Sequence, residues 1–422
     1  MKEKSERRKT RRIVPALLGW FAAHARDLPW RRTRDAYAIW VSEVMLQQTQ
    51  VKTVLPYWER WMKAMPDVRA LGRARSRTLH KLWEGLGYYT RVRNMQKAAR
   101  LIVAQHGGKF PQKFEEVLAL PGIGRYTAGA ICSIAFNHPT PIVDGNVARV
   151  LARVFGVEGE VRDKDVRERL WELAGELVGE AQNFKLRASN FNETSNSKLQ
   201  KETTAPLTTD TAQSRGSFHV SLFTYHAFGC SHLNQSLMEL GALVCTPKGP
   251  RCEVCPVATN CVAFREGRVE ELPVMGARQR TTQRRFVAVA LQRKGSFFVQ
   301  QRPGGIVNGH LWEFPNVEVG LRSNGRREAK RMLGENGAVS EPFCTIKHSI
   351  TRYRITMEVF RARGELTNEW GPPSLKLWRT SQTNGDGKWL RPEQLRRLPF
   401  ASAHRKVLEK LLGETGKLKT GK

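Results

Sequence analysis

Four cysteines lie within a short stretch near the middle of the chain and could together bind a metal centre. Cys245, Cys252, Cys255 and Cys261 follow the spacing C-x6-C-x2-C-x5-C. Four thiolates can hold a tetrahedral zinc ion or a cubane iron–sulfur cluster, and structural zinc sites usually use two close cysteine pairs. Because this chain has one close pair flanked by longer loops with proline and glycine, the spacing favours a 4Fe-4S cluster. Zinc is the first alternative, and four unliganded thiols packed as small apolar residues are the second.

Two carboxylates stand in surroundings that suit acid–base chemistry. Glu43 lies inside an apolar helical stretch, residues 40–46, which is followed by three glutamines. Burial raises the pKa of a glutamate, and a protonated carboxyl can act as a general acid. The alternative is a helix glutamate that faces solvent. Asp144 precedes a helical stretch near Val147, where it either caps the helix or points into a cleft and stabilises a cationic sugar. We expect these two residues to carry the bond-breaking chemistry.

A glycine-rich turn joins two predicted helices within residues 120–128. Gly122 and Gly124 allow a tight backbone turn around Ile123, which can fill the angle between the helices. The exposed N–H groups of such a turn, at a helix N-terminus, suit a phosphate oxygen. The pattern is typical of a helix–hairpin–helix, which binds DNA without reading its sequence. The alternative is an ordinary glycine-rich connection between helices.

The charge of the chain agrees with a polyanionic partner. The 422 residues contain 70 Lys and Arg against 39 Asp and Glu, a formal net charge of +31. Such an excess most often serves nucleic-acid binding, and solubility alone is the alternative. No apolar stretch reaches the length of a membrane span, residues 2–12 lack the core of a signal peptide, and the cysteines do not form a secreted disulfide pattern. We therefore expect a cytoplasmic protein without membrane association, and the basic run at 7–12 leaves a nuclear location open.

Hydrophobic periodicity divides the chain into a helical part and a mixed part. Apolar residues recur at three-to-four spacing from residue 13 to about 180, which predicts an all-α domain of many short helices. Strand-like segments appear after residue 286 and predict a small α+β domain. The predicted order is a basic tail at 1–12, the all-α domain at 13–262 with a disordered insert at 183–231, a linker at 263–285, the α+β domain at 286–413 and a basic tail at 414–422.

The hairpin, Asp144 and the cysteine quartet together resemble the endonuclease III superfamily of base-excision glycosylases and, within it, the adenine DNA glycosylases (the MutY family). The matching stretches are residues 28–31, 42–51, 85–89, 120–128, 144–147 and 245–261. The resemblance implies a helix–hairpin–helix glycosylase domain with an iron–sulfur loop. It also implies a monomeric enzyme that binds double-stranded DNA and hydrolyses the N-glycosidic bond of adenine mispaired with 8-oxoguanine or G.

The resemblance assigns catalytic roles to four positions. It implies that Glu43 protonates adenine at N7, so that the base leaves as a neutral molecule, and that Asp144 stabilises the oxocarbenium-like sugar. Asn146 and Tyr126 are implied to assist at the same site. Bifunctional relatives place a lysine nucleophile where this chain has Tyr126, so the resemblance implies a monofunctional glycosylase that leaves the abasic site uncut.

The resemblance also implies a set of DNA contacts. The family's adenine pocket corresponds here to Arg26, Leu28, Trp30, Arg31, Leu46, Val51 and Gln235. Gln48 and Tyr88 are expected to probe the opposite strand once adenine has left the base stack, and Gly122 and Gly124 are expected to contact phosphate. The competing hypotheses are a related glycosylase or lyase for mismatched thymine or oxidised pyrimidine, and a DNA-binding relative without turnover. The presence of both carboxylates argues against the second.

The C-terminal domain resembles the Nudix-like module with which this family recognises 8-oxoguanine. Residues 309–315 and 389–390 match its pattern. A Nudix hydrolase needs paired glutamates on a helix to hold Mg²⁺. The corresponding positions hold Arg331 and Met332, so we do not expect pyrophosphohydrolase activity. His348 and Thr351 are the candidates for contact with the lesion, and a strand face without that contact is the alternative.

Overall fold

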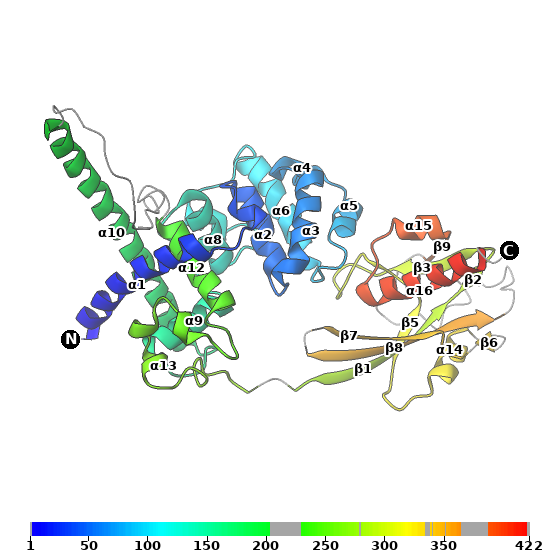
Figure 1. Cartoon of the computed structure of the whole chain (residues 1–422). Coiled ribbons are helices and arrows are strands. Elements are labelled where there is room, and N and C mark those ends of the chain that lie inside the picture. The colour runs from blue at the N-terminus through cyan, green and yellow to red at the C-terminus, as the bar shows by residue number, and fades with distance from the viewer. Residues whose placement is uncertain are drawn as a thin grey trace, which may run out of the picture. The chain divides into compact units, whose positions relative to one another are not determined.

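The computed structural model describes residues 2–202, 229–277, 280–333, 338–339, 341–350, 352–363 and 387–419. The chain forms two compact units. The first comprises residues 1–72 and 95–277, and the second comprises residues 73–94 together with 278–422. Figure 1 shows the helices and strands with the labels used below. Among the described helices, none combines the length and the apolar character that crossing a membrane requires.

The first unit is built from helices and short 3-10 turns, which confirms the predicted all-α fold. Its helices are α1 (Lys2–His24), α2 (Ala36–Leu46), α3 (Val51–Ala64), α4 (Val68–Arg73), α6 (Thr90–Gln105), α7 (Phe114–Leu118), α8 (Arg125–Phe136), α9 (Gly145–Phe155), α10 (Lys164–Glu202), α12 (Gly229–Leu243) and α13 (Val262–Arg265). The 3-10 turns are η1 (Pro29–Arg31), η2 (Cys252–Val254) and η3 (Ala258–Asn260). α4 ends and α6 begins in residues that belong to the second unit.

One apolar core of the first unit lies where α1, α9, α10 and α12 meet. Each helix contributes aliphatic side chains at helical spacing, including Leu17, Leu151, Leu177 and Leu237, which are all at most 1 % exposed. Burying one leucine stabilises the fold by about 2 kcal/mol relative to leaving it in water. α12 packs against α1, α8, α9 and α10. The side chains on α12 and α9 are therefore held in a fixed relation to each other.

The second unit combines a helical piece of the chain with two small sheets. Its helices are α5 (Ser76–Leu82), α14 (Gly325–Leu333), α15 (Pro392–Arg396) and α16 (Ser402–Lys419). Its strands are β1 (Thr282–Ala290), β2 (Gln292–Arg293), β3 (Ser296–Gln301), β4 (Trp312–Glu313), β5 (Asn316–Val319), β6 (Ala338–Val339), β7 (Cys344–Ile350), β8 (Tyr353–Arg363) and β9 (Gly387–Leu390). In the described residues, one sheet has the order β5-β1-β8-β6 with β7 also paired to β8, and the other has the order β2-β3-β4 with β9 paired to β3.

Both faces of β1 are covered, because successive residues of a strand point to opposite sides of the sheet. Val287 and Val289 face one apolar core, which includes residues of α14. Ala288 and Ala290 face the other core, which includes Phe400 and residues of α16. β1 runs parallel to β8 and antiparallel to β5. This arrangement of helices on a mixed sheet confirms the predicted α+β class.

The compact units divide the chain differently from the predicted domain boundaries. Residues 73–94, predicted inside the all-α domain, belong to the second unit. The predicted basic tail at 1–12 is instead the first part of α1, which begins at Lys2. It is held against the first unit, since Lys9 Nζ donates to the Val154 carbonyl at 2.6 Å and Thr10 is buried. The predicted linker at 263–285 begins with α13 and contains Leu272, which is buried in the first core, so that it extends only from about 275 to 281.

The predicted insert and C-terminal tail also differ from the structure at their edges. α10 continues to Glu202 and α12 begins at Gly229. Of the predicted insert at 183–231, residues 203–228 lie outside the described part of the chain. α16 continues to Lys419, beyond the predicted domain end at residue 413.

Candidate active site and cysteine pocket

Glu43 is buried in the middle of α2. The helix begins after Asp35, whose side chain accepts a hydrogen bond from the Tyr37 backbone N–H. Ten of its eleven residues are buried, so the Glu43 side chain leaves solvent with them and is 6 % exposed. Burial, opposed by a hydrogen bond from Tyr126 and supported by the charge of Asp144, raises the pKa of Glu43 to about 7. A substantial fraction of the carboxyl is therefore protonated at pH 7, and most of it is protonated at lower pH.

Tyr126 lies in the first turn of α8 and contacts Glu43 directly. Its hydroxyl donates to Glu43 Oε2 at 2.7 Å and lies 3.4 Å from Met238 Sδ. Burial, with the nearby carboxylates, raises the pKa of Tyr126 well above its ordinary value, so the hydroxyl keeps its proton. A donor fixed on Oε2 leaves Oε1 of Glu43 to carry the acidic proton.

Asp144 is both the N-cap of α9 and a member of the same site. It accepts hydrogen bonds from the Val147 backbone N–H at 2.7 Å and from Asn146 Nδ2 at 3.0 Å. Burial raises the pKa of Asp144, and these hydrogen bonds counteract the rise. Two neighbouring carboxyl groups in unlike environments separate into an acid and an ionised partner. The hydrogen bonds that Asp144 accepts favour its ionised form, whereas the larger effect at Glu43 is burial, which favours its protonated form.

Arg149 links the N-terminal part of α9 to α12 and to the start of the cysteine loop through hydrogen bonds. Its Nη2 donates to Asn146 Oδ1 at 2.9 Å and to the Gly241 carbonyl at 2.7 Å, and its Nε donates to the Cys245 carbonyl at 2.7 Å. Asn146, which donates to Asp144, is thereby held by a side chain that also fixes the backbone of the first cysteine.

Glu239 is a buried carboxylate, not predicted from the sequence, that binds two arginines predicted for the adenine pocket. It projects from α12 and accepts Arg26 Nη2 at 2.7 Å and Arg31 Nη2 at 2.9 Å on Oε2, and its side chain is 1 % exposed. Burial alone raises the pKa of a carboxyl, but the hydrogen bonds from Arg26 and Arg31 outweigh burial and lower the pKa of Glu239 to about 2. A glutamate inside the apolar sequence of α12 is the signal that could have found it, since Glu43 was found by the same signal.

The other predicted pocket residues of the first unit lie at different depths: Leu28, Trp30 and Gln235 are buried, Leu46 and Val51 are half-buried, and Gln48 is exposed. The Trp30 ring packs edge-on against Trp58 with ring centroids 6.0 Å apart. Gln235 Nε2 donates to Ser231 Oγ at 3.2 Å, one helical turn before Glu239. Tyr88 belongs to the second unit.

The predicted hairpin has the backbone that its glycines indicate. Gly122 has φ of +80°, a conformation that favours glycine, and Gly124 is the N-cap of α8. Both glycines are exposed, and Ile123 between them is 7 % exposed. The turn therefore buries its one apolar side chain and presents its backbone to solvent, as phosphate binding requires.

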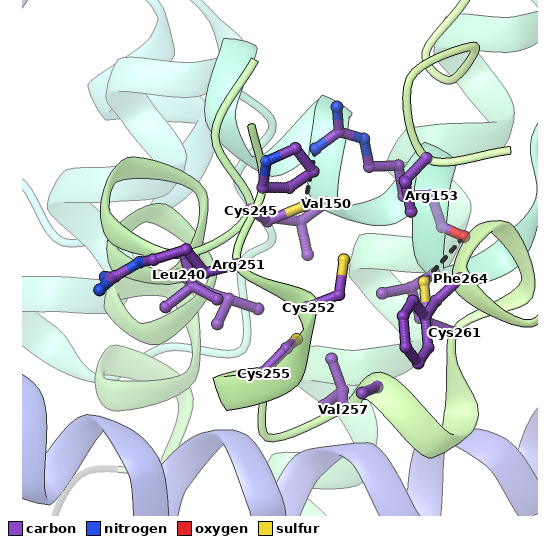
Figure 2. A pocket seen from close by; sticks show the side chains of 15 residues that line it. Val150, Arg153, Leu240, Cys245, Arg251, Cys252, Cys255, Val257, Cys261 and Phe264 are labelled. Carbon is purple, nitrogen blue, oxygen red and sulfur yellow. Dashed lines mark hydrogen bonds between the residues drawn. The ribbon is translucent and has the colours of Figure 1, made fainter. Parts of the chain in front are cut away.

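The four cysteines of the quartet line one pocket, as Figure 2 shows. Arg153 Nη1 lies 3.3 Å from Cys245 Sγ, and the Cys261 thiol lies 3.4 Å from the Arg153 carbonyl. Burial raises the pKa of Cys255 to about 11 and also raises the pKa of Cys252 and Cys261. Thiolates form in such a pocket only with a compensating positive charge. In the described part of the chain, no group of three or more His, Cys, Asp or Glu side chains is arranged to hold a single metal ion.

In the second unit, one of the two lesion-contact candidates can be placed. His348 lies on β7 and is half-buried, burial lowers its pKa, and its Nδ1 has no hydrogen-bond partner within the described ranges. Thr351 lies outside the described residues. At the positions of the Nudix metal ligands on α14, Arg331 is exposed and Met332 is packed in the core.

Comparison with known families first defines the class of protein. Residues 41–176 match the HhH-GPD superfamily of base excision DNA repair proteins, and residues 286–410 match the NUDIX domain. The exposed hairpin, the buried acid and the N-cap aspartate all lie within the first match. A base-excision DNA glycosylase followed by a Nudix-like domain is therefore the class that fold and site define.

Similar proteins then identify the family. The adenine DNA glycosylase of Rattus norvegicus is 33 % identical over 451 residues, which cover 93 % of this chain and 76 % of the relative. The adenine DNA glycosylase of Buchnera aphidicola subsp. Schizaphis graminum is 30 % identical and covers 73 % and 75 %, and that of Homo sapiens is 40 % identical and covers 62 % and 41 %. The chain belongs to the adenine DNA glycosylase family, whose members hydrolyse N-glycosyl bonds in DNA. This confirms the resemblance found in the sequence.

Proposed function

We propose that this protein removes adenine mispaired with 8-oxoguanine or G from double-stranded DNA. The observation that supports this most directly is the buried Glu43 carboxyl, which has a pKa of about 7 and accepts a hydrogen bond from Tyr126. Adenine leaves deoxyribose poorly as an anion, so its departure needs an acid that is still protonated near neutral pH. An ordinary exposed glutamate would already have lost that proton.

In the proposed reaction, the C1′–N9 bond breaks as Glu43 transfers its proton to N7. The bonding electron pair goes to the base, which leaves neutral, and the positive charge stays on the sugar. The Asp144 carboxylate stabilises that charge, and hydrogen bonds from the Val147 N–H and from Asn146 hold it in place and favour its ionised form. Water then adds at C1′ and gives its proton to a carboxylate, which completes hydrolysis.

We also propose that the abasic product is left uncut. Cleavage by β-elimination through a Schiff base needs an amine nucleophile. Tyr126 occupies the position where bifunctional relatives carry the lysine, and its hydroxyl is committed to Glu43. Borohydride trapping tests this directly. We expect no covalent protein–DNA adduct, and efficient trapping would contradict a monofunctional mechanism.

We propose that Cys245, Cys252, Cys255 and Cys261 hold a 4Fe-4S cluster. The residues fit this cofactor because the four thiols line one pocket and because the iron core supplies the positive charge that their ionisation needs. Its expected role is to shape the basic loop that carries Lys248 and Arg251. Iron and sulfide analysis of protein purified without oxygen should give about four of each per chain; bound zinc in place of iron would overturn the assignment.

We place 8-oxoguanine recognition in the C-terminal domain, with His348 as its described candidate. His348 is half-buried on β7, within the part of the chain that matches the NUDIX domain, and this position supports the assignment. A monomeric state and a cytoplasmic location stay predictions from the sequence.

A substrate panel tests the proposed function. Duplexes that carry adenine opposite 8-oxoguanine, G or T are incubated with excess enzyme, and free adenine is quantified. We expect the fastest release opposite 8-oxoguanine, slower release opposite G, and the slowest opposite T. Duplexes of the same length that carry a mismatched thymine or an oxidised pyrimidine are tested in parallel. Release of one of these bases in place of adenine would indicate a glycosylase of the related specificity.

A further inference from the structure

Glu84 joins residues 73–94 to the C-terminal part of the second unit. Its Oε1 accepts hydrogen bonds from the Phe400 backbone N–H at 2.9 Å and from Arg405 Nε at 2.7 Å, and its Oε2 accepts one from Arg405 Nη2 at 2.8 Å. Lys81 Nζ adds a fourth donor at 2.6 Å. The Glu84 and Arg405 side chains are only 13 % and 17 % exposed. A paired carboxylate and guanidinium with this degree of burial and two parallel hydrogen bonds fix geometry as well as charge.

Further contacts join the same two stretches. The ring of His80, which is 2 % exposed, stacks on His310 with ring centroids 6.4 Å apart and an interplanar angle of 18°. Arg93 Nη1 donates to the Gly309 carbonyl at 3.3 Å. Contacts with Glu84 therefore form part of a broader surface between α5, the turn after it, and the C-terminal domain.

The turn that follows Glu84 has a constrained backbone. Gly87 has φ of +70°, and Tyr88 has φ of +46°, a region that side chains other than glycine rarely adopt. Trp83 Nε1 donates to the Gly87 carbonyl at 3.0 Å, and Arg91 Nη2 donates to the Leu86 carbonyl at 2.9 Å. Because neighbouring side chains bind both carbonyls, the turn is held in a conformation that it would not adopt alone.

These restraints keep the Tyr88 ring exposed. The ring is 42 % exposed, and the Arg91 guanidinium lies 5.6 Å from its centroid and 5.3 Å from that of Trp83. An exposed aromatic side chain on a rigid, strained turn suits insertion into a base stack. Trp83, which supports the turn, is the residue next to Glu84.

We propose that Arg405 and the Phe400 N–H of the C-terminal domain position the Tyr88 ring through Glu84. The C-terminal domain, which we propose recognises 8-oxoguanine, and the turn that carries Tyr88 would then contact DNA as a single rigid unit. This inference rests on the proposed function, in which the C-terminal domain and Tyr88 both contact the DNA strand that carries 8-oxoguanine. Glu84 and Arg405 are positioning residues, since neither is assigned a contact with the reacting atoms.

The test uses the full chain and a duplex with an uncleavable 2′-fluoro-2′-deoxyadenosine opposite 8-oxoguanine. A 2-aminopurine beside the 8-oxoguanine reports insertion, because its fluorescence rises when its stacking is broken. We expect Glu84→Gln and Arg405→Gln each to lose most of the fluorescence rise and to weaken binding about fivefold or more, and the double variant to be no worse than either single variant. Exchanging the two charges (E84R with R405E) should restore part of the signal. Glu393→Gln, which removes an exposed charge from α15, is the matched control.

Two outcomes would overturn the inference. The first is wild-type fluorescence and affinity in both single variants, with a change only in melting temperature, since that would show a purely stabilising contact. The second is an additive loss in the double variant, since that would show two independent effects. Adenine release from an ordinary mispaired duplex is measured in parallel with the wild-type chain. Failure of that release contradicts the proposed function, whereas release without any variant effect on fluorescence contradicts only the positioning role.

Discussion

Glu43 and Glu239 are both glutamates buried in apolar helices, yet their pKa values move in opposite directions. Glu43 receives a neutral hydroxyl donor from Tyr126, so burial dominates and its pKa rises to about 7. Glu239 receives two guanidinium groups, so its pKa falls to about 2. The first residue is an acid near neutral pH, and the second is a permanent anion. Their partners, rather than their burial, decide which chemistry each can perform.

The pKa of Glu43 predicts the pH dependence of the chemical step. Glu43 must be protonated to act as an acid, so the single-turnover rate of adenine release should level off about one pH unit below 7 and fall about tenfold per pH unit well above 7. A fall at low pH is also expected, because Asp144 must be ionised. Rates measured from pH 5 to pH 9 check this. A rate that keeps rising to pH 9 would show that Glu43 acts as a base or takes no part.

Glu239→Gln should loosen the two arginines assigned to the adenine pocket. Glu239 has a lowered pKa, so its stabilisation is present above its unfolded-state value near 4.5 and is lost as pH falls toward 2. At neutral pH we expect a loss of about 2 kcal/mol, because Arg26 is partly exposed and its share is screened. Urea unfolding of both proteins at pH 7 and pH 3 measures this. The difference between the two should shrink at pH 3, and a difference independent of pH would contradict the ion-pair explanation.

At the scale of elements, the site depends on how closely α12 approaches α9. A Cβ added at Gly241 would lie 2.7 Å from Asn146 Cβ and 2.9 Å from its carbonyl oxygen. Glycine at this position lets the two helices touch where Asn146 holds Asp144. The same contact brings Arg149 within reach of the Gly241 carbonyl and of Cys245.

Gly241→Ala should therefore separate α12 from α9. We expect a loss of stability of about 2 kcal/mol and a slower chemical step, because the added methyl group displaces Asn146 from Asp144. Gly175→Ala on α10 is the control, because a Cβ there meets nothing within 4 Å. That change should be neutral or stabilise by up to about 1 kcal/mol, since alanine is the better helix former. Equal effects of the two changes, in denaturation and in single-turnover rate, would rule out the close approach as the cause.

Local patterns predicted some of these elements and failed on others for physical reasons. The hairpin and α2 were predictable because glycine spacing and an apolar stretch are properties of neighbouring residues. The pairing of Glu239 with Arg26 and Arg31 was not, because those partners lie more than 200 positions away in the chain. Residues 2–12 of α1 were predicted as a tail because charged side chains, Lys9 and Glu6, make contacts from this stretch to α9 and α10.

At the scale of the whole molecule, the predicted domain order held but the compact units did not follow it. Residues 73–94 carry the helical periodicity of the first part of the chain, yet they belong to the second unit. The cause is a set of contacts such as Glu84 with Arg405, which no sequence period records. The net charge of +31 was predictable without any structure, because it depends only on composition.

This charge predicts strong salt dependence of DNA binding. If the chain neutralises four or more phosphates, its affinity for an undamaged duplex should fall at least about 100-fold between 50 and 200 mM salt. The rate of adenine release from an already bound mispair should change little, because Glu43 is buried and screened from ions. Fluorescence anisotropy and single-turnover rates check the two statements. Affinity that is independent of salt would show that the basic charge serves solubility alone.

We propose that Glu43 supplies the proton that releases adenine, and the rest of the proposed mechanism depends on this step. Single-turnover release from a duplex with adenine opposite 8-oxoguanine, compared between the wild-type chain and Glu43→Gln, tests it most directly. We predict that the variant binds the duplex as well as the wild-type chain does and releases adenine at least about 1000-fold more slowly, since it has no acidic proton to transfer. Release within about tenfold of the wild-type rate would remove Glu43 from the mechanism and contradict the account.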